Sequence, residues 1–283
     1  MIVKDPTEKF LSADDINFVN ELLIEAGGLA VELQMDCFNA KGLEVESAKA
    51  QGLLSADEKV SQVLVEKLER YFVNHKVISE EALPEEFLME DGYLWLVDPI
   101  DGTHHYLAND TQYSVMIGLL HGGKPIYGWV YNPAFSMLYF GGPDYGIQCL
   151  DHLQKITRTI ERPSSLKESL VRVILGRRDK KNNPWLDTMS NVKIIEAGSI
   201  GYKLSKILDG EADCLLHLAG RLKIWDTAGP VALALAAGLD VGGYDTDELP
   251  YPANSFVHPM AVVMGKKGSL QWFRNRVSKE WIQ

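Results

Sequence analysis

Two aspartates separated by a Pro-Ile pair mark the most informative stretch of the chain, Trp95–Thr103. An apolar run precedes Asp98, and Pro99 cannot donate a hydrogen bond to a neighbouring strand, so we predict a buried strand that ends here. Gly102 permits a close approach of the backbone, and Thr103 offers a hydroxyl at a helix start or turn. Carboxylates next to exposed backbone N–H groups can hold a cation and a phosphate side by side.

Three further acids lie at the boundaries of predicted elements. Asp57 stands at a helix start, Glu80 near the end of a short strand, and Asp226 at the start of an Ala-rich helix. Taken alone, Asp57 and Asp226 would be explained by the helix dipole and by N-capping. Acids that converge on one site, however, repel one another unless cations neutralise them. Oxygen ligands without nearby cysteine or clustered histidine favour Mg²⁺ or Mn²⁺ over Zn²⁺, and Mg²⁺ commonly acts on phosphates.

The composition narrows the class of partner. The chain has 283 residues, of which 46% are hydrophobic, and a formal net charge of −11, which argues against nucleic acid or an anionic membrane as the main partner. No apolar run is long enough to span a bilayer, and the first ten residues lack the apolar core of a signal peptide. Cys37, Cys149 and Cys214 show no metal-binding spacing, so we expect a cytoplasmic protein with free thiols.

The elements that position the acids fall into two halves. In residues 1–150 we expect helices at about 13–38 and from about 57 to 72, with a connection at 40–54 between them. The two acid-bearing strands follow, and then an antiparallel meander at 113–150.

In residues 151–283, a polar and basic linker at 151–170 precedes alternating strands and helices, which are typical of an α/β arrangement. A turn at Gly198 and Ser199 opens one of these helices, and the last strand is expected at 256–264. We therefore predict a fold that mixes α+β and α/β parts, a layered αβαβα sandwich. Its N-terminal half carries an antiparallel sheet, and its C-terminal α/β half completes the site.

Three segments in this order, Val77–Glu81, Trp95–Thr103 and Trp225–Gly229, resemble the inositol monophosphatase superfamily of metal-dependent, lithium-sensitive phosphatases. The Asp-Pro-Ile-Asp-Gly-Thr run is specific, and the similarity covers nearly the whole chain. Its spacing differs from the Asp-x-Asp pattern of aspartyl-phosphate phosphatases, so Asp98 is not assigned as a nucleophile. The resemblance implies a phosphoric monoester hydrolase that acts on a small phosphorylated metabolite with two or three Mg²⁺ ions, and it suggests a homodimer.

The resemblance also implies which residues bind the metals. Glu80, Asp98 and the backbone carbonyl of Ile100 would bind the first ion. Asp98, Asp101 and Asp226 would bind the second. Asp98 would therefore bridge the two.

Two further roles follow from the same resemblance. Gly102 and Thr103 match the positions that hold the phosphate with backbone N–H groups at a helix start. Asp57 matches the acid that helps the Thr103 hydroxyl to activate the attacking water, and Glu80 belongs to the same catalytic set. No covalent intermediate is needed.

The identity of the ester depends on segments outside these motifs. Inositol monophosphatases usually carry glutamate where this chain has Ala219 and glycine where it has Ser79. The glycine placement of 218–224 is more like that of the 3′(2′),5′-bisphosphate nucleotidase branch. We therefore favour a nucleotide such as 3′-phosphoadenosine 5′-phosphate, with inositol monophosphate as the alternative.

The turn at Gly198 and Ser199 is a candidate substrate contact. Candidates for contact with a second phosphate or for the rim of the site are Arg177, Arg178, Lys180, Arg221 and Lys223, although a solvated basic face explains them equally well. Leu54 stands where the family usually has threonine, three residues before Asp57. This departure keeps a second class of function open, a catalytically weak relative that acts through a protein partner.

Overall fold

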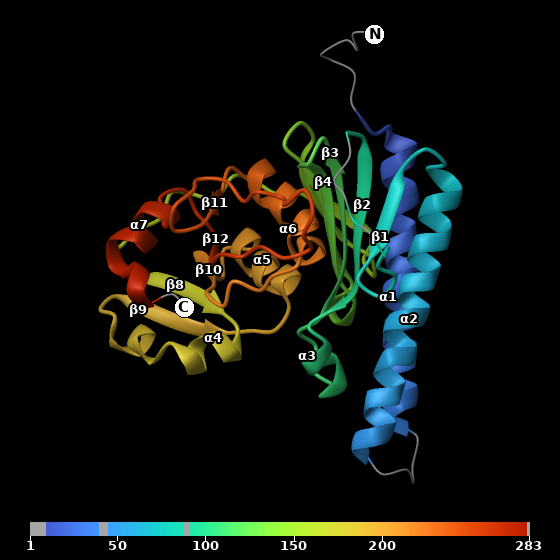
Figure 1. Ribbon diagram of the computed structural model, residues 1–283, viewed down its shortest axis with the longest axis horizontal. Coiled ribbons are helices and arrows are strands. Elements are labelled where there is room, and N and C mark those ends of the chain that lie inside the picture. Colours follow the sequence, from blue (N-terminus) through green and yellow to red (C-terminus); the bar gives the residue numbers. More distant parts are fainter. Residues whose placement is uncertain (1–9, 40–44, 86, 88–90, 282–283) are drawn as a thin grey trace.

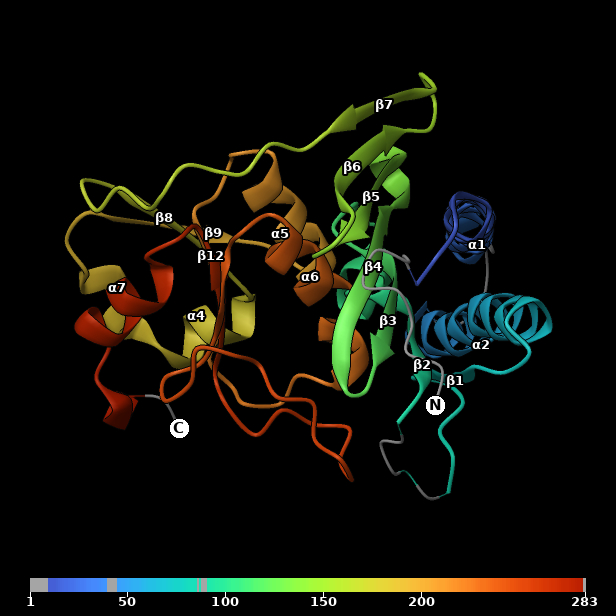
Figure 2. The ribbon, with the colours of Figure 1, turned by 90° about the horizontal axis from the view of Figure 1, so that it is seen from above.

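The computed structural model describes residues 10–39, 45–85, 87 and 91–281, and for residues 37–39 and 45–55 it describes the backbone alone. Five layers follow one another: a helix pair, a seven-stranded sheet, a second helix pair, a five-stranded sheet and outer helices (Figure 2). This arrangement confirms the predicted αβαβα sandwich.

The first sheet has its strands in sequence order, and β1 and β2 pair in parallel while the later neighbours are antiparallel. Its strands are β1 (Lys76–Ser79), β2 (Tyr93–Asp101), β3 (Ser114–His121), β4 (Lys124–Asn132), β5 (Met137–Gly142), β6 (Gly146–Asp151) and β7 (Ile156–Thr159). The predicted meander is confirmed, but part of the predicted linker at 151–170 is the edge strand β7. Every residue of β7 is exposed, and its sequence, Ile-Thr-Arg-Thr, lacks the apolar alternation over several residues that indicates a strand.

Two long helices, α1 (Ala13–Asn39) and α2 (Val45–Tyr71), cover the outer face of this sheet (Figure 1). The first agrees with the prediction. The second begins at Val45 instead of near Asp57, so the predicted connection at 40–54 is largely helical. Residues 45–56 include three alanines and two leucines and contain no proline, a composition that favours helix even without a clear apolar stripe.

Strand β2 continues through Pro99 to Asp101, so the prediction that the strand ends at the proline is wrong. The pairing of β2 with β1 stops at Val97, and its pairing with β3 changes register between Asp98 and Asp101. Pro99 therefore lies in an irregular stretch where it need not donate a ladder hydrogen bond. The short helix α3 (Thr103–Leu107) follows directly.

Helices α5 (Ile200–Leu208) and α6 (Ile224–Ala236) lie between the two sheets. Glycine lets α6 approach the first sheet closely, because a Cβ added at Gly128 in β4 would lie 2.2 Å from the backbone oxygen of Gly229. This contact fixes the first turns of α6, which carry Asp226, against the sheet.

The second sheet has the order β11-β12-β10-β8-β9. Its strands are β8 (Val171–Leu175), β9 (Val192–Glu196), β10 (Cys214–His217), β11 (Asp240–Gly242) and β12 (Val262–Gly265). The parallel pairing of β8 with β9 and β10 agrees with the predicted α/β half. The last strand is shorter than predicted, since β12 begins at Val262. The outer helices are α4 (Arg177–Asn182) and α7 (Ser269–Arg276), with 3₁₀ turns at Pro133–Phe135, Pro184–Thr188 and Lys279–Trp281.

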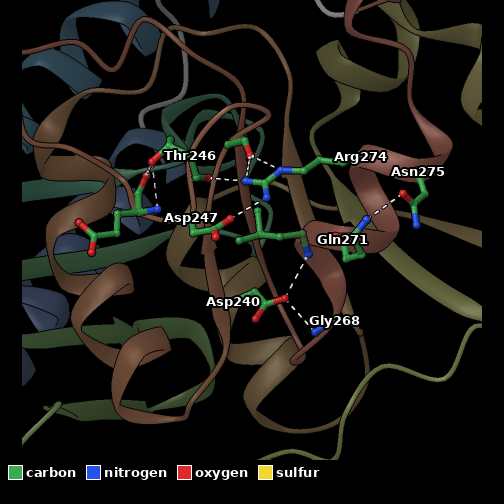
Figure 3. Close-up of polar contacts among 10 residues, drawn as sticks. Asp240, Thr246, Asp247, Gly268, Gln271, Arg274 and Asn275 are labelled. Carbon is green, nitrogen blue, oxygen red and sulfur yellow. Dashed lines mark hydrogen bonds and ion pairs between the residues drawn. The ribbon is translucent and has the colours of Figure 1, made fainter.

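Arg274 fixes α7 to the loop that follows β11 (Figure 3). Its guanidinium donates to the carbonyl oxygens of Gly243 (2.9 Å) and Thr246 (2.7 Å) and pairs with Asp247 (2.6 Å). The last helix is thereby tied to the edge of the second sheet.

Within the described ranges, no helix has the length and apolar character needed to cross a membrane. Cys149 and Cys214 are buried free thiols, as predicted, while the side chain of Cys37 lies outside the described residues.

Candidate active site

Three carboxylates converge where β1, β2 and α6 meet. Oxygens of Glu80, just after β1, of Asp98 in β2 and of Asp226 in α6 lie within 4.8 Å of one another. Asp98 is 1% exposed, and its Oδ1 has no hydrogen-bond partner among the described residues. Because a buried carboxylate oxygen is costly without a partner, this arrangement favours a cation beside Asp98.

Asp101 belongs to the same acidic group and is held by the start of α5. Its Oδ2 accepts hydrogen bonds from the Ser199 hydroxyl (2.6 Å) and the Gly201 N–H (3.1 Å). Ser199 is also the N-cap of α5, since its hydroxyl oxygen accepts a bond from the Tyr202 N–H (3.0 Å). The first turn of α5 therefore orients Asp101.

Burial acts on every acid of the group, and the charges of neighbouring acids act on most of them. Burial raises the pKa of Asp98 well above its usual range, and the charges of Asp101 and Glu80 add to the shift. Burial also raises the pKa of Glu80, of Asp101 and of Asp226. In α2, burial and then the charges of neighbouring glutamates raise the pKa of Asp57 to about 8. Bound cations would reverse this preference for the neutral acids.

The donor set fits a hard divalent cation. Carboxylates make up the described cluster, with no cysteine or histidine in it, which suits Mg²⁺ or Mn²⁺. Asp226 is further oriented by the Lys223 N–H, which donates to its Oδ2 at 2.7 Å. Ile100 lies between the two aspartates of β2, with its side chain buried.

A buried lysine that the sequence reasoning missed lies near this group. Lys203 in α5 is 3% exposed, and burial lowers the pKa of its amine, while the charges of Asp101 and Asp179 oppose that shift. Lys203 thus supplies part of the local positive charge that an acidic protein needs at an anion site. Its sequence neighbours indicate only an amphipathic helix, so no local signal identified it.

Gly102 and Thr103 stand at the start of α3. Gly102 has a φ of 90°, which favours glycine, and a Cβ there would lie 2.9 Å from the carbonyl oxygen of Gln112. The Gly198 N–H donates to Oε1 of Gln112 at 3.0 Å, and Ser199 lies next to Gly102. The structure therefore brings the starts of α3 and α5 together beside Asp101.

Of the predicted arginine contacts, Arg178 and Arg221 line a cavity and Arg177 does not. Arg221 lines a cavity, together with Ala219 and Arg178. Arg177 is exposed on α4 and is not among the residues that line this cavity; its neighbour Arg178 is. The side chain of Leu54 lies outside the described residues.

Known proteins are similar to this chain over most of its length. A model of the inositol monophosphatase family matches residues 14–271. The chain is 30% identical over 227 residues to a 3′(2′),5′-bisphosphate nucleotidase CysQ from Haemophilus influenzae, which covers 77% of this chain and 81% of the relative. It is 26% identical over 219 residues to inositol monophosphatase 1 from Bos taurus, covering 72% of this chain and 76% of that one.

A solved structure of CysQ from Bacteroides thetaiotaomicron has a TM-score of 0.73 at 22% identity and covers 92% of this chain and 100% of that chain. The structural likeness confirms the predicted fold, and the matches confirm the predicted enzyme class, a phosphatase. The chain belongs to the inositol monophosphatase family.

Proposed function

We propose that this phosphatase hydrolyses a small soluble phosphomonoester with Mg²⁺, and that its substrate is a nucleotide with two phosphates, such as 3′-phosphoadenosine 5′-phosphate. The convergence of Glu80, Asp98 and Asp226 around a buried oxygen of Asp98 carries the proposal. The activity named for the Haemophilus influenzae relative supports the substrate. We place the reaction in the cytoplasm, where buried free thiols such as Cys149 remain reduced.

The acids divide between two ion positions in this proposal. Glu80, Asp98 and the Ile100 carbonyl would hold one Mg²⁺, and Asp98, Asp101 and Asp226 would hold a second. The proposal allows two or three ions in all, and it allows Mn²⁺ in place of Mg²⁺. Bound Mg²⁺ supplies charge neutralisation at the phosphoryl and leaving oxygens and lowers the pKa of water. The crowding of acids that raises the pKa of Asp98 supports this need for cations.

The remaining residues bind the phosphate and move a proton. N–H groups of Gly102 and Thr103 would donate to phosphoryl oxygens and stabilise the charge that develops there. Bound cations would favour the charged form of Asp57, which could then accept a proton from the attacking water, and the Thr103 hydroxyl would orient that water. The water oxygen forms a bond to phosphorus, the bond to the leaving oxygen breaks, and that oxygen takes a proton. No side chain becomes esterified.

Inositol monophosphate is the second candidate substrate, and the likeness to the Bos taurus enzyme favours it. Ala219 and Ser79 favour the nucleotide, because both differ from the residues usual in inositol monophosphatases. Ser79 is buried, and its hydroxyl shares a hydrogen bond of 2.7 Å with that of Ser61. The remaining alternative is a weak catalyst that acts through a protein partner.

We also propose that the protein forms a homodimer.

Phosphate release tests the proposal directly. We would measure kcat/KM for 3′-phosphoadenosine 5′-phosphate and inositol 1-phosphate with Mg²⁺, with EDTA, and with Mg²⁺ plus Li⁺. We expect the bisphosphate to be preferred, activity to be lost in EDTA, and Li⁺ to inhibit. No release from any ester by folded protein would contradict hydrolysis, and a large preference for inositol 1-phosphate would overturn the substrate. Light scattering in solution would decide the dimer.

A further inference from the structure

A cavity of about 550 Å³ opens between the α4 segment, the loop that leads into α6, and the C-terminal turn. Sites for small molecules have volumes of about 300–1,000 Å³, so the cavity is large enough for a ligand. Arg178 of α4 and Trp185 of the 3₁₀ turn at Pro184–Thr188 line one side of it. Ala219 and Arg221 line it from the loop before α6, and Trp281 lines it from the C-terminal turn.

Lys203, a buried lysine of α5, lies near both the wall of this cavity and the carboxylate cluster. Asp179 lines the cavity, and its Oδ1 accepts a hydrogen bond from the Leu218 N–H at 3.2 Å. A Cβ added at Gly176 would lie 3.8 Å from both the Oδ2 of Asp179 and the Nζ of Lys203. The charges of Asp179, Asp101 and Asp226 all act on that amine. Asp179 in the cavity wall and two acids of the cluster therefore surround the same buried lysine, which does not itself line the cavity.

Two arginines of the cavity lining have no partner among the described residues of the protein. Arg178 and Arg221 are both exposed, and within the described ranges neither guanidinium takes part in an ion pair or hydrogen bond. Asp179 and Glu280 also line the cavity, and the buried Asp179 already accepts a hydrogen bond from the Leu218 N–H. Guanidinium groups bind phosphate through paired N–H donors, and these two have that capacity unused by the protein.

The same cavity carries two indole rings. The ring centroids of Trp185 and Trp281 are 5.2 Å apart, and the planes are inclined by 37°. Trp185 is oriented by Asn183, whose Oδ1 accepts a bond from its Nε1–H at 3.2 Å. Rings of this kind offer faces on which a nucleobase can stack.

We infer that this cavity binds the leaving group of the substrate, with an aromatic base against Trp185 and Trp281 and a second phosphate on Arg178 and Arg221. The inference rests on the proposed function and deepens it, because a polyol monophosphate has neither the ring nor the second anion that these residues would bind. Ala219 fits the same assignment, since a glutamate there would place a negative charge in the wall that faces the second phosphate.

The arginines are tested with three esters: adenosine 3′,5′-bisphosphate, adenosine 3′-monophosphate and glycerol 2-phosphate. In the double variant Arg178→Ala/Arg221→Ala we expect KM for the bisphosphate to rise at least about thirtyfold, because two charge-assisted contacts are lost. KM for adenosine 3′-monophosphate should change less than about threefold. Arg70→Ala, which removes an exposed arginine of α2, is the charge control and should leave all three values unchanged.

The tryptophans are tested with the same esters. Trp185→Leu should lower kcat/KM for both adenosine esters about tenfold, the effect of one lost stacking contact, and Trp185→Phe should restore most of it. Hydrolysis of glycerol 2-phosphate should not change, and it reports whether a variant is folded and active. Equal losses on all three esters, or none on any, would overturn the cavity assignment. Failure of the unaltered protein to hydrolyse any ester would instead refute the proposed function.

Discussion

Asp98 shows at the level of one residue why this site is unfavourable without a cation. A carboxylate that is 1% exposed and carries an unpartnered oxygen among the described residues loses most of its hydration and gains little in return. The charges of Asp101 and Glu80 increase the cost. The chain therefore keeps a costly group at a position where it would bind metal.

Replacing Asp98 tests this interpretation. Asp98→Asn should lower kcat/KM by at least about a thousandfold, because several kcal/mol of transition-state charge stabilisation depend on the metal. The melting temperature in EDTA should stay the same or rise, since one repelling charge is removed. The measurements are phosphate release and thermal unfolding of both proteins in EDTA; a fully active variant would refute the metal assignment.

Asp57 makes the stability of the metal-free protein depend on pH. Its pKa is raised from 3.8 to about 8 on folding, so the folded state holds a proton that the unfolded state has released. Stability must then decrease as the pH rises toward 8, by up to about 1.4 kcal/mol per pH unit for one such group. Burial lowers the pKa of His217 and His258 to about 4, so their opposing contribution is complete by about pH 7.

Urea unfolding in EDTA between about pH 7 and about pH 8 measures this slope. We expect the free energy of unfolding to fall with pH, Asp57→Asn to make the fall shallower, and saturating Mg²⁺ to do the same by stabilising the charged acids. Stability that rises with pH in EDTA over this window would contradict the assignment.

At the scale of elements, the strands and helices that could be predicted are those marked by turn residues and a regular apolar pattern in the sequence. Turn residues such as Gly122 and Pro133 separate strands with clear apolar runs, and the meander β3–β6 was therefore predictable. The start of α2 and the strand β7 were not, because neither shows the apolar period used to recognise it. Pro99 was misinterpreted because a proline ends a strand only where its neighbours need its N–H, and the change of register removes that need.

The residues of the site also fall into those that local sequence predicts and those that it does not. Glu80, Asp98 and Asp226 could be predicted because each stands within a recognisable motif, and the structure brings them together. Lys203 could not, because its role comes from its closeness to acids on elements that are distant in the sequence. Helical sequence around Lys203 shows the face it lies on and says nothing of the acids that face it.

The contact between α6 and the first sheet offers a test at this scale. Gly128→Ala would place a Cβ 2.2 Å from a backbone oxygen of Gly229, so α6 must shift. We expect a loss of about 1–3 kcal/mol of stability and reduced activity, since Asp226 moves with its helix. Gly28→Ala is the matched control: a Cβ at Gly28 in α1 meets nothing within 4 Å, and it should stabilise the protein by about 0.5–1 kcal/mol. Chemical denaturation compares the two, and equal effects would contradict the close contact.

At the scale of the whole molecule, the hydrophobic core does not follow the division into halves 1–150 and 151–283. One buried cluster joins Met116 and Val130 of the first sheet to Leu204 of α5 and Leu233 of α6. The acidic site is shared in the same way, because Glu80 and Asp98 come from the first half and Asp226 from the second. Neither half can bury its inner sheet face or assemble the acids alone.

This sharing predicts how the protein unfolds. We expect one cooperative thermal transition, with the calorimetric and van't Hoff enthalpies equal, because losing either half exposes the common core. Mg²⁺ at about a hundred times its Kd should raise the single melting temperature by roughly 5–10 °C, since binding only to the folded state adds about 2.7 kcal/mol to a chain of this size. Asp226→Asn should reduce the Mg²⁺-dependent rise while leaving one transition. Two transitions, with only one of them moved by Mg²⁺, would show that the halves fold independently and that the site belongs to one of them, because an ion held by acids from both halves must stabilise both.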